Sequence, residues 1–488
     1  MSRNAILLGL SLWLALLLVT HRGPHSPYSY ALQPEGVPNP RYVGGDAPSV
    51  VPVTRFLYDG TIPSFARAHN LHLPMHSFSA SVVTAFIRKY DVANDITNLL
   101  FLLLLAAAAL RAADKAGLNR GAQFFGMATM LVLPPVVGFI GQPMHYIVGP
   151  VVNYLIILAA MTADDEQLRN PWFAGALTAI LSLSYDWYVL GAALLVYILF
   201  VVRLPDFRRI GMFLVIALLP AASWGRFLDW ISRGEVSNTI RVTFVGAVIA
   251  EWINFLREPF HKPVFPLVAT QIGATIAFDQ ILALIYWPLI LVCGIVLWRN
   301  RGSETRTRAW ILLALLAVFF FLEQMFTAVG DWENNPRRAF PFFFAFAVVY
   351  CWAAHVMWAK KAWRITFIAL FVSTSLFSFA DAISGASGIA PLYTGETIRG
   401  SAKFPMQFQG SKIIVAAKPL PEQEVIGQSF PRADVSNIGW EWAVANLFSA
   451  TMLLVLLLLL VHAGLLPRAV PYATAAVLVV SAAVRFVV

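Results

Sequence analysis

Long apolar stretches, each close to the length of a membrane span, recur along almost the whole chain. A helix crosses about 30 Å of hydrocarbon with about 20 residues, because it rises about 1.5 Å per residue. Thirteen stretches approach this length, at residues 4–20, 93–112, 122–141, 146–163, 171–186, 188–202, 210–224, 280–298, 309–329, 339–358, 363–380, 442–463 and 469–487. The pattern predicts an all-α polytopic membrane protein with about 13 transmembrane helices.

Basic residues are distributed unevenly over the connections between these stretches. Short cytoplasmic loops of membrane proteins carry an excess of Lys and Arg. Fifteen basic residues fall in the connections on one side, and only two in the three short connections on the other. The N-terminus is therefore predicted to be cytoplasmic and the C-terminus extracytoplasmic. Residues 4–20 also resemble a signal peptide, but no Ala-x-Ala site follows, which favours an uncleaved anchor.

Three long segments fall outside by the same count, at 21–92, 225–279 and 381–440. The second segment mixes Trp, Arg and Glu with interrupted apolar runs. It is typical either of interfacial helices on the outer leaflet or of a hairpin that dips into the membrane. The third segment is polar and contains a strand-like run at 412–416.

Composition agrees with this reading and excludes several classes of protein. The chain of 488 residues is 59% hydrophobic and 12% charged, with a mean hydropathy of +0.70. Soluble domains are about 25% charged, so a soluble globular or disordered protein is excluded. The net charge of +9 lies mainly in the short connections, so it orients the spans and does not predict a nucleic-acid partner. Cys293 and Cys351 both lie in apolar stretches and form no disulfide framework.

The first outer segment carries a recognisable order of features. Asp46 follows the first span, a helix with the basic residue Arg55 ends in a Leu-x-x-Gly pattern, and Pro74 precedes an apolar helix that returns to the second span. This layout resembles the GT-C class of integral-membrane glycosyltransferases, such as the protein mannosyltransferases and aminoarabinose transferases. Three later features fit it as well: the outside turn at 141–146, the polar span end at 185–188, and the Pro-Arg-Arg stretch at 336–341.

The resemblance covers roughly residues 1–380 as an architecture. It implies a GT-C-like transmembrane catalytic region with short interfacial helices in its outer loops, followed by an outer polar segment at 381–440 and a C-terminal transmembrane pair at 441–488. It also implies an enzyme of the bacterial inner (plasma) membrane. Such an enzyme moves a sugar from a polyprenyl-phosphate carrier to a glycan, lipid or protein acceptor on the extracytoplasmic face.

Two carboxylates of the first outer segment are candidates for the catalytic base. Sugar transfer needs a base to deprotonate the acceptor and cations to stabilise the departing phosphate. Asp46 stands between Gly45 and Ala47 close to the membrane surface, although it also fits a helix N-cap before Pro48. Asp59 is the second candidate, and its Tyr-Asp-Gly-Thr context also fits a plain turn.

Arg337 and Arg338 are the candidates for binding the donor phosphate, with Arg55 as a weaker third. The pair interrupts the positive-inside pattern, and guanidinium groups bind phosphate oxygens bidentately. The alternative is a structural ion pair with Asp331 or Glu333, a few residues upstream.

Further polar residues are candidates for binding the substrate: His69, His72, His76, His145 and Asp186. Three of the histidines would share a helical face, but Pro74 interrupts that helix, and both a zinc site and hydrogen bonds to a sugar or phosphate stay open. Gln142 and His145 stand where the family often has a second acid, and this departure counts against a two-acid or metal-bridged arrangement. A divalent metal stays open as a cofactor. Two alternative functions stay open: an O-antigen-type oligosaccharide ligase or polymerase, and a lipid or sugar transporter or flippase.

Overall fold

The structure is a computed structural model, and it describes residues 3–21, 47–61, 75–132, 147–184, 188–231, 292, 294–296, 310–315, 318, 350–386, 433–434 and 438–487. These residues form helices joined by short turns, with no strand among them. The helices are α1 (Arg3–His21), α2 (Ala47–Asp59), α3 (Met75–Ile87), α4 (Tyr90–Lys115), α5 (Arg120–Leu131), α7 (Val148–Thr162), α8 (Asp165–Arg169), α9 (Pro171–Ser184), α10 (Tyr188–Val196), the π-helix η3 (Tyr197–Val202), α11 (Phe207–Ile231), α17 (Lys361–Ala386), α20 (Trp440–His462) and α21 (Ala469–Val487).

Four of these helices contain a segment long and apolar enough to cross a membrane: Val92–Lys115, Phe207–Trp224, Trp440–His462 and Ala469–Phe486. Five shorter apolar helices accompany them, at Asn4–Leu16, Met75–Ile87, Val148–Thr162, Pro171–Leu183 and Gly191–Val202. The helical membrane character expected from the sequence is therefore found, whereas the number of 13 spans stays a prediction. The expected spans at 280–298, 309–329 and 339–358 lie mostly outside the described residues, and the strand-like run at 412–416 lies entirely outside them.

The outward faces of several helices are apolar, as a lipid-facing bundle requires. Large exposed apolar side chains lie on α1, α11, α17 and α21, among them Leu12, Leu219, Leu376 and Val479. In water these side chains would form an unfavourable surface, whereas hydrocarbon solvates them well. The exposed apolar faces therefore support the membrane location.

One end of the bundle, here called the basic end, gathers connections that the sequence places on one side of the membrane. Lys115 Nζ at the end of α4 donates to the carbonyl of Ala463 in the α20–α21 turn (2.7 Å), and Gln167 Nε2 of α8 donates to the carbonyl of His462 (2.9 Å). The backbone N–H of Asn119, before α5, donates to His355 Nδ1 (2.9 Å). Helices far apart in sequence thus end at the same level, as the alternating topology requires.

Helices that start at the basic end are capped by nearby side chains. Asn119 Oδ1 accepts the backbone N–H of Gly121 (2.8 Å), and Asp206 Oδ1 accepts that of Arg209 (2.7 Å). Asp164 and Gln167 form a reciprocal capping box at the start of α8. These residues satisfy the N–H groups that a helix start leaves without intrahelical partners, which explains where α5, α8 and α11 begin.

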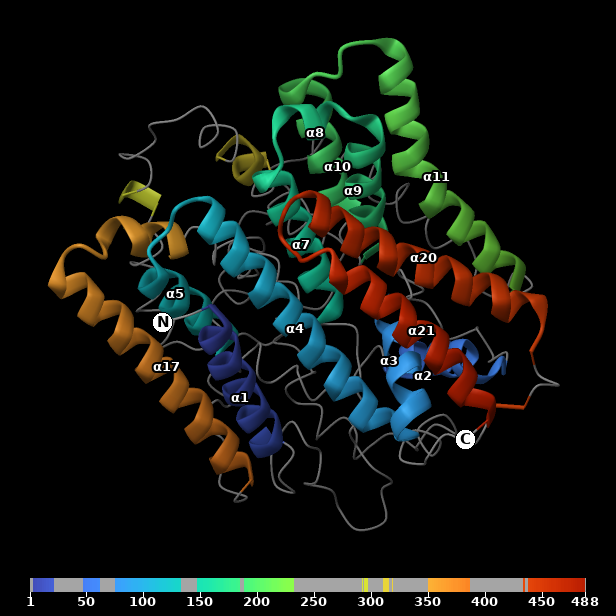
Figure 1. Cartoon of the computed structure of the whole chain (residues 1–488), viewed down its shortest axis with the longest axis horizontal. Coiled ribbons are helices and arrows are strands. Elements are labelled where there is room, and N and C mark those ends of the chain that lie inside the picture. Colours follow the sequence, from blue (N-terminus) through green and yellow to red (C-terminus); the bar gives the residue numbers. More distant parts are fainter. Residues whose placement is uncertain are drawn as a thin grey trace, which may run out of the picture.

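The opposite end of the bundle, here called the polar end, holds α2 and α3 together with the start of α4 and the end of α21. Figure 1 shows α21 returning along α20 and finishing beside α2 and α3. Most side chains of α3 are buried, including several polar ones. The polar side chains of Ser81 and Thr84 can be buried because their hydroxyls donate to carbonyls of their own helix, at 2.7 Å each.

Candidate functional site

The end of α2 forms the centre of the candidate site. Gly60 follows its last residue with a φ of 80°, a left-handed conformation that suits glycine, and its N–H donates to the carbonyl of Phe56 (2.9 Å). This glycine is the one in the Leu-x-x-Gly pattern that the sequence predicts at the end of a helix. The predicted helix end is therefore confirmed.

The carbonyl of Leu57, in the last turn of α2, receives two side-chain donors from the C-terminal helices. Arg485 Nη1 of α21 lies 2.7 Å away, and Trp442 Nε1 of α20 lies 3.0 Å away. Carbonyls in the last turn of a helix have no intrahelical donor, and a cation is favoured there by the helix dipole. The C-terminal pair α20–α21 thus caps the helix of the first outer segment.

Arg485 is buried, with 3% of its surface exposed. Besides Leu57, its guanidinium contacts Ser81 Oγ of α3 (3.2 Å) and Asn446 Oδ1 of α20 (3.4 Å), and it lies 5.8 Å from the ring centre of Tyr58. Burial raises the pKa of Tyr58, which therefore stays neutral beside this cation. One guanidinium links four helices.

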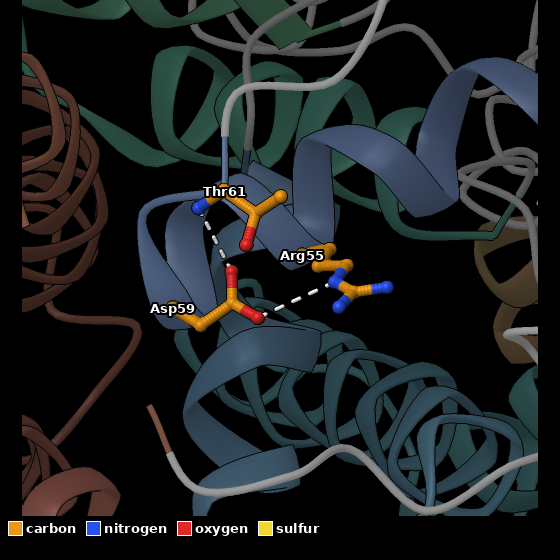
Figure 2. A network of polar contacts seen from close by, with 3 residues as sticks. All are labelled: Arg55, Asp59 and Thr61. Carbon is orange, nitrogen blue, oxygen red and sulfur yellow. Dashed lines mark hydrogen bonds and ion pairs between the residues drawn. The ribbon is translucent and has the colours of Figure 1, made fainter. Parts of the chain in front are cut away.

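Asp59, the last residue of α2, is also buried and uses both carboxylate oxygens within the segment. Oδ1 accepts the N–H of Thr61 (2.9 Å), and Oδ2 lies 3.3 Å from Arg55 Nε, one turn back along the helix. Figure 2 shows these two contacts converging on the carboxylate. The hydrogen bond between Asp59 and Thr61 closes a turn of the kind that the Tyr-Asp-Gly-Thr context fits. The role of Asp59 as a base stays a prediction. Arg55 is partly buried and pairs with Asp59.

His76, near the start of α3, is enclosed between α3 and α4. Its Nε2 lies 2.8 Å from Asn94 Oδ1, and Asn94 Nδ2 donates in turn to Asp95 Oδ1 (3.3 Å). Burial lowers the pKa of His76 to about 4, and the hydrogen bond to Asn94 opposes this shift only in part. A neutral His76 is therefore part of a buried polar chain that joins the first outer segment to the second span.

Among the described residues, the buried Asp, Glu, His, Lys and Arg side chains all lie at the polar end. They are Asp59, His76, Asp95 and Arg485. They come from α2, α3, α4 and α21, which pack on one another there. Ionisable groups buried in a membrane protein are costly, and they mark functional regions more often than they stabilise the fold. This end is therefore the candidate functional site.

The residues predicted from the sequence fall into two groups. Asp59, Arg55 and His76 lie at the polar end. Seven others lie outside the described residues: Asp46, His69, His72, His145, Asp186, Arg337 and Arg338. Asp46 directly precedes Ala47, the first residue of α2. The described residues contain no group of three His, Cys, Asp or Glu side chains that could hold a metal ion.

Two buried residues of the site, Asp95 and Arg485, are not among the sequence-based candidates. A signal for each is present, because an ionisable residue inside an apolar span is by itself a functional indication. Asp95 stands in the first turns of the second expected span, and Arg485 near the end of the last one. No family model, curated protein or solved structure matches the chain. Its function is therefore argued from these residues and their geometry.

Proposed function

We propose that the protein is a membrane glycosyltransferase that moves a sugar from a polyprenyl-phosphate carrier to an acceptor at the polar end of the bundle. The supporting observation is that the four buried Asp, His and Arg side chains of the described residues all lie at this one end. The proposal places the basic end in the cytoplasm and the polar end at the extracytoplasmic face of a bacterial inner membrane.

The position of these residues favours an enzyme over a transporter. A transporter binds its substrate near the middle of the bilayer, between broken helices in matching halves. Here the four buried Asp, His and Arg residues lie at the ends of α2 and α21 and at the starts of α3 and α4. A reaction at one membrane face needs fixed polar groups at that level, and this arrangement supplies them.

The order of helices in the first outer segment supports the GT-C-like assignment. Between α1 and α4 the chain forms α2, directly after Asp46, and α3, which packs against α4. In the proposal, Asp46 is the base for the acceptor hydroxyl, and Arg337 and Arg338 bind the donor phosphate. Asp59, whose carboxylate is occupied by Arg55 and Thr61, holds the end of α2.

The proposed reaction is tested with purified protein, a polyprenyl-phosphate sugar that is radiolabelled in the sugar, and a cell-envelope extract as the source of the glycan, lipid or protein acceptor. The assay follows transfer of label to the acceptor and release of the free carrier. Asp46→Asn should lower turnover by at least about 100-fold, the lower range for a general base. The matched control, Asp59→Asn, keeps an acceptor for Thr61 and should retain most of the turnover. Equal loss in both variants, or loss in Asp59→Asn alone, would contradict the assignment of Asp46.

The arginine pair is tested separately through donor affinity. Replacing Arg337 or Arg338 by Lys keeps the charge but loses the bidentate fork. Affinity for the donor should weaken by about 1.5–3 kcal/mol, the range for hydrogen bonds to charged groups, and more in the Ala variants. A structural ion pair to Asp331 or Glu333 would instead lower the melting temperature and leave donor affinity unchanged.

The same assay separates the alternative functions. An oligosaccharide ligase or polymerase would release carrier only from a lipid-linked oligosaccharide and not from a single lipid-linked sugar. A transporter or flippase would release none, but would move labelled lipid across the membrane of a reconstituted vesicle. Either result would overturn the proposed transfer of a single sugar.

A further inference from the structure

We propose that Arg485 is a positioning residue, which clamps the C-terminal helix α21 onto the end of α2 and so holds the first outer segment in its working place. Its effect on catalysis rests on the proposed function, whereas its effect on α2 does not. The observation behind it is the set of hydrogen bonds that join one buried guanidinium to α2, α3 and α20.

Helix α2 needs such support because its sequence makes it weak in isolation. It has only 13 residues, and Pro48 and Pro52 are among them. Proline suits the first turn, but Pro52 lies deeper and cannot donate a backbone hydrogen bond. Isolated helices of fewer than about 12–15 residues are marginal even without proline. The stability of α2 therefore depends on what it contacts.

The contacts made by Arg485 support α2 at its C-terminal end. Leu57 lies in the last turn, where the carbonyls of a helix lack intrahelical donors. Trp442 supplies one donor to Leu57 and Arg485 a second, and only Arg485 also reaches Ser81 of α3. A guanidinium has five N–H donors in a planar fork, so it can hold several acceptors at once, which an ammonium does less well.

The inward direction of the side chain argues for a specific role. Arg485 stands in the last turn of α21, where a long basic side chain can extend to the membrane surface at little cost. Instead it is buried, and its Nε has no hydrogen-bond partner among the described residues. The energy of desolvating this cation is offset by contacts that tie α2 in place. Because Asp46 directly precedes α2, a side chain that holds α2 in place also limits the movement of the proposed base.

Hydrogen–deuterium exchange of the full-length protein in detergent tests the clamp without reference to activity. In Arg485→Met, peptides covering α2 should exchange at least about 10-fold faster, since hydrogen bonds to a charged group are lost and every 1.4 kcal/mol is tenfold. Arg485→Lys and Trp442→Phe should give smaller increases. Peptides covering α9 and α11 should be unchanged. The matched control is Arg468→Met, an exposed arginine at the basic end, which should leave α2 unchanged.

Two results would overturn the clamp: α2 that exchanges at the wild-type rate in Arg485→Met, or exchange that rises equally in all helices. The second result would mean a general loss of stability. Met fills much of the same volume, so the melting temperature should stay close to that of the wild type while α2 loosens.

Turnover gives the catalytic part of the test. In Arg485→Met, kcat should fall at least about 10-fold while the KM for the donor stays within about two-fold, because the donor-binding arginines are untouched. Unchanged kcat with faster exchange in α2 would remove the catalytic consequence of the clamp. If the wild-type protein transfers no sugar, the proposed function fails, and the exchange data alone decide whether Arg485 holds α2.

Discussion

Acidification should destabilise the folded protein through His76, and the size of the effect follows from its surroundings. The imidazole is buried with Nε2 against Asn94, and its pKa is lowered from 6.5 to about 4. Above pH 6.5 the ring is neutral in the folded and the unfolded chain, so it contributes no pH dependence there. Between pH 6.5 and 4 the imidazole of His76 binds a proton in the unfolded chain but stays largely neutral in the folded chain. The free energy of unfolding should therefore fall by about 3 kcal/mol across this range.

The measurement compares thermal unfolding in detergent for the wild type and His76→Gln, from pH 7 down to pH 4. Gln can still reach Asn94 with its amide, but it does not fill the space of the buried ring, so the variant should be less stable at pH 7. Because Gln carries no charge at any pH, the variant should lose less stability on acidification. The carboxylates Asp59 and Asp95 are present in both proteins, so the difference between the two curves isolates His76. His462→Gln, which changes an exposed histidine at the basic end, is the matched control and should follow the wild type.

The reasoning would be refuted by parallel curves. If the wild type and His76→Gln lose the same stability between pH 6.5 and 4, then His76 accepts its proton in the folded state as readily as in the unfolded one. That outcome would require water or a carboxylate at His76 Nδ1, an atom without a hydrogen-bond partner among the described residues.

Two further outcomes are expected. Gly126→Ala should lower the melting temperature, because its added Cβ would lie 2.7 Å from Cys351 Sγ and overpacking costs about 1–3 kcal/mol. Gly211→Ala is the control: its Cβ would meet open space, so this variant should be neutral or slightly stabilising. Single cysteines at Asp206 and Gly439, in a chain without its native cysteines, should label from opposite sides of the membrane. Labelling of both from one side would contradict the topology.

Much of the helical framework could be predicted from the sequence, because apolar length is a local property. The expected spans at 171–186 and 188–202 correspond closely to α9 and to α10 with η3. Boundaries were harder, since α11 continues as a helix through Ile231, beyond the expected end at 224. Polar residues at a helix end give a weak local signal, and helical backbone geometry can accommodate them for some turns.

The polar end was only partly predictable, because its contacts join residues far apart in the sequence. The residue types of His76 and Asp59 make both of them candidates in the sequence, where the context of Asp59 also fits a plain turn. The two partners of the Leu57 carbonyl, Trp442 and Arg485, stand 385 and 428 residues further along the chain. No local pattern indicates that pairing. Hydrophobic periodicity indicates which face of a helix is buried. It does not indicate which polar side chain of a distant helix will donate a hydrogen bond to a helix end.

The two ends of the bundle differ in how their helix termini are satisfied, and this difference bears on function. At the basic end α5, α8 and α11 start with caps supplied two or three residues away, which can form as each helix forms. At the polar end the last turn of α2 depends on Trp442 and Arg485, which lie 385 and 428 residues away from Leu57. Those bonds can form only once α20 and α21 are in place. The reaction proposed for the polar end would therefore depend on the C-terminal pair as well as on the first outer segment.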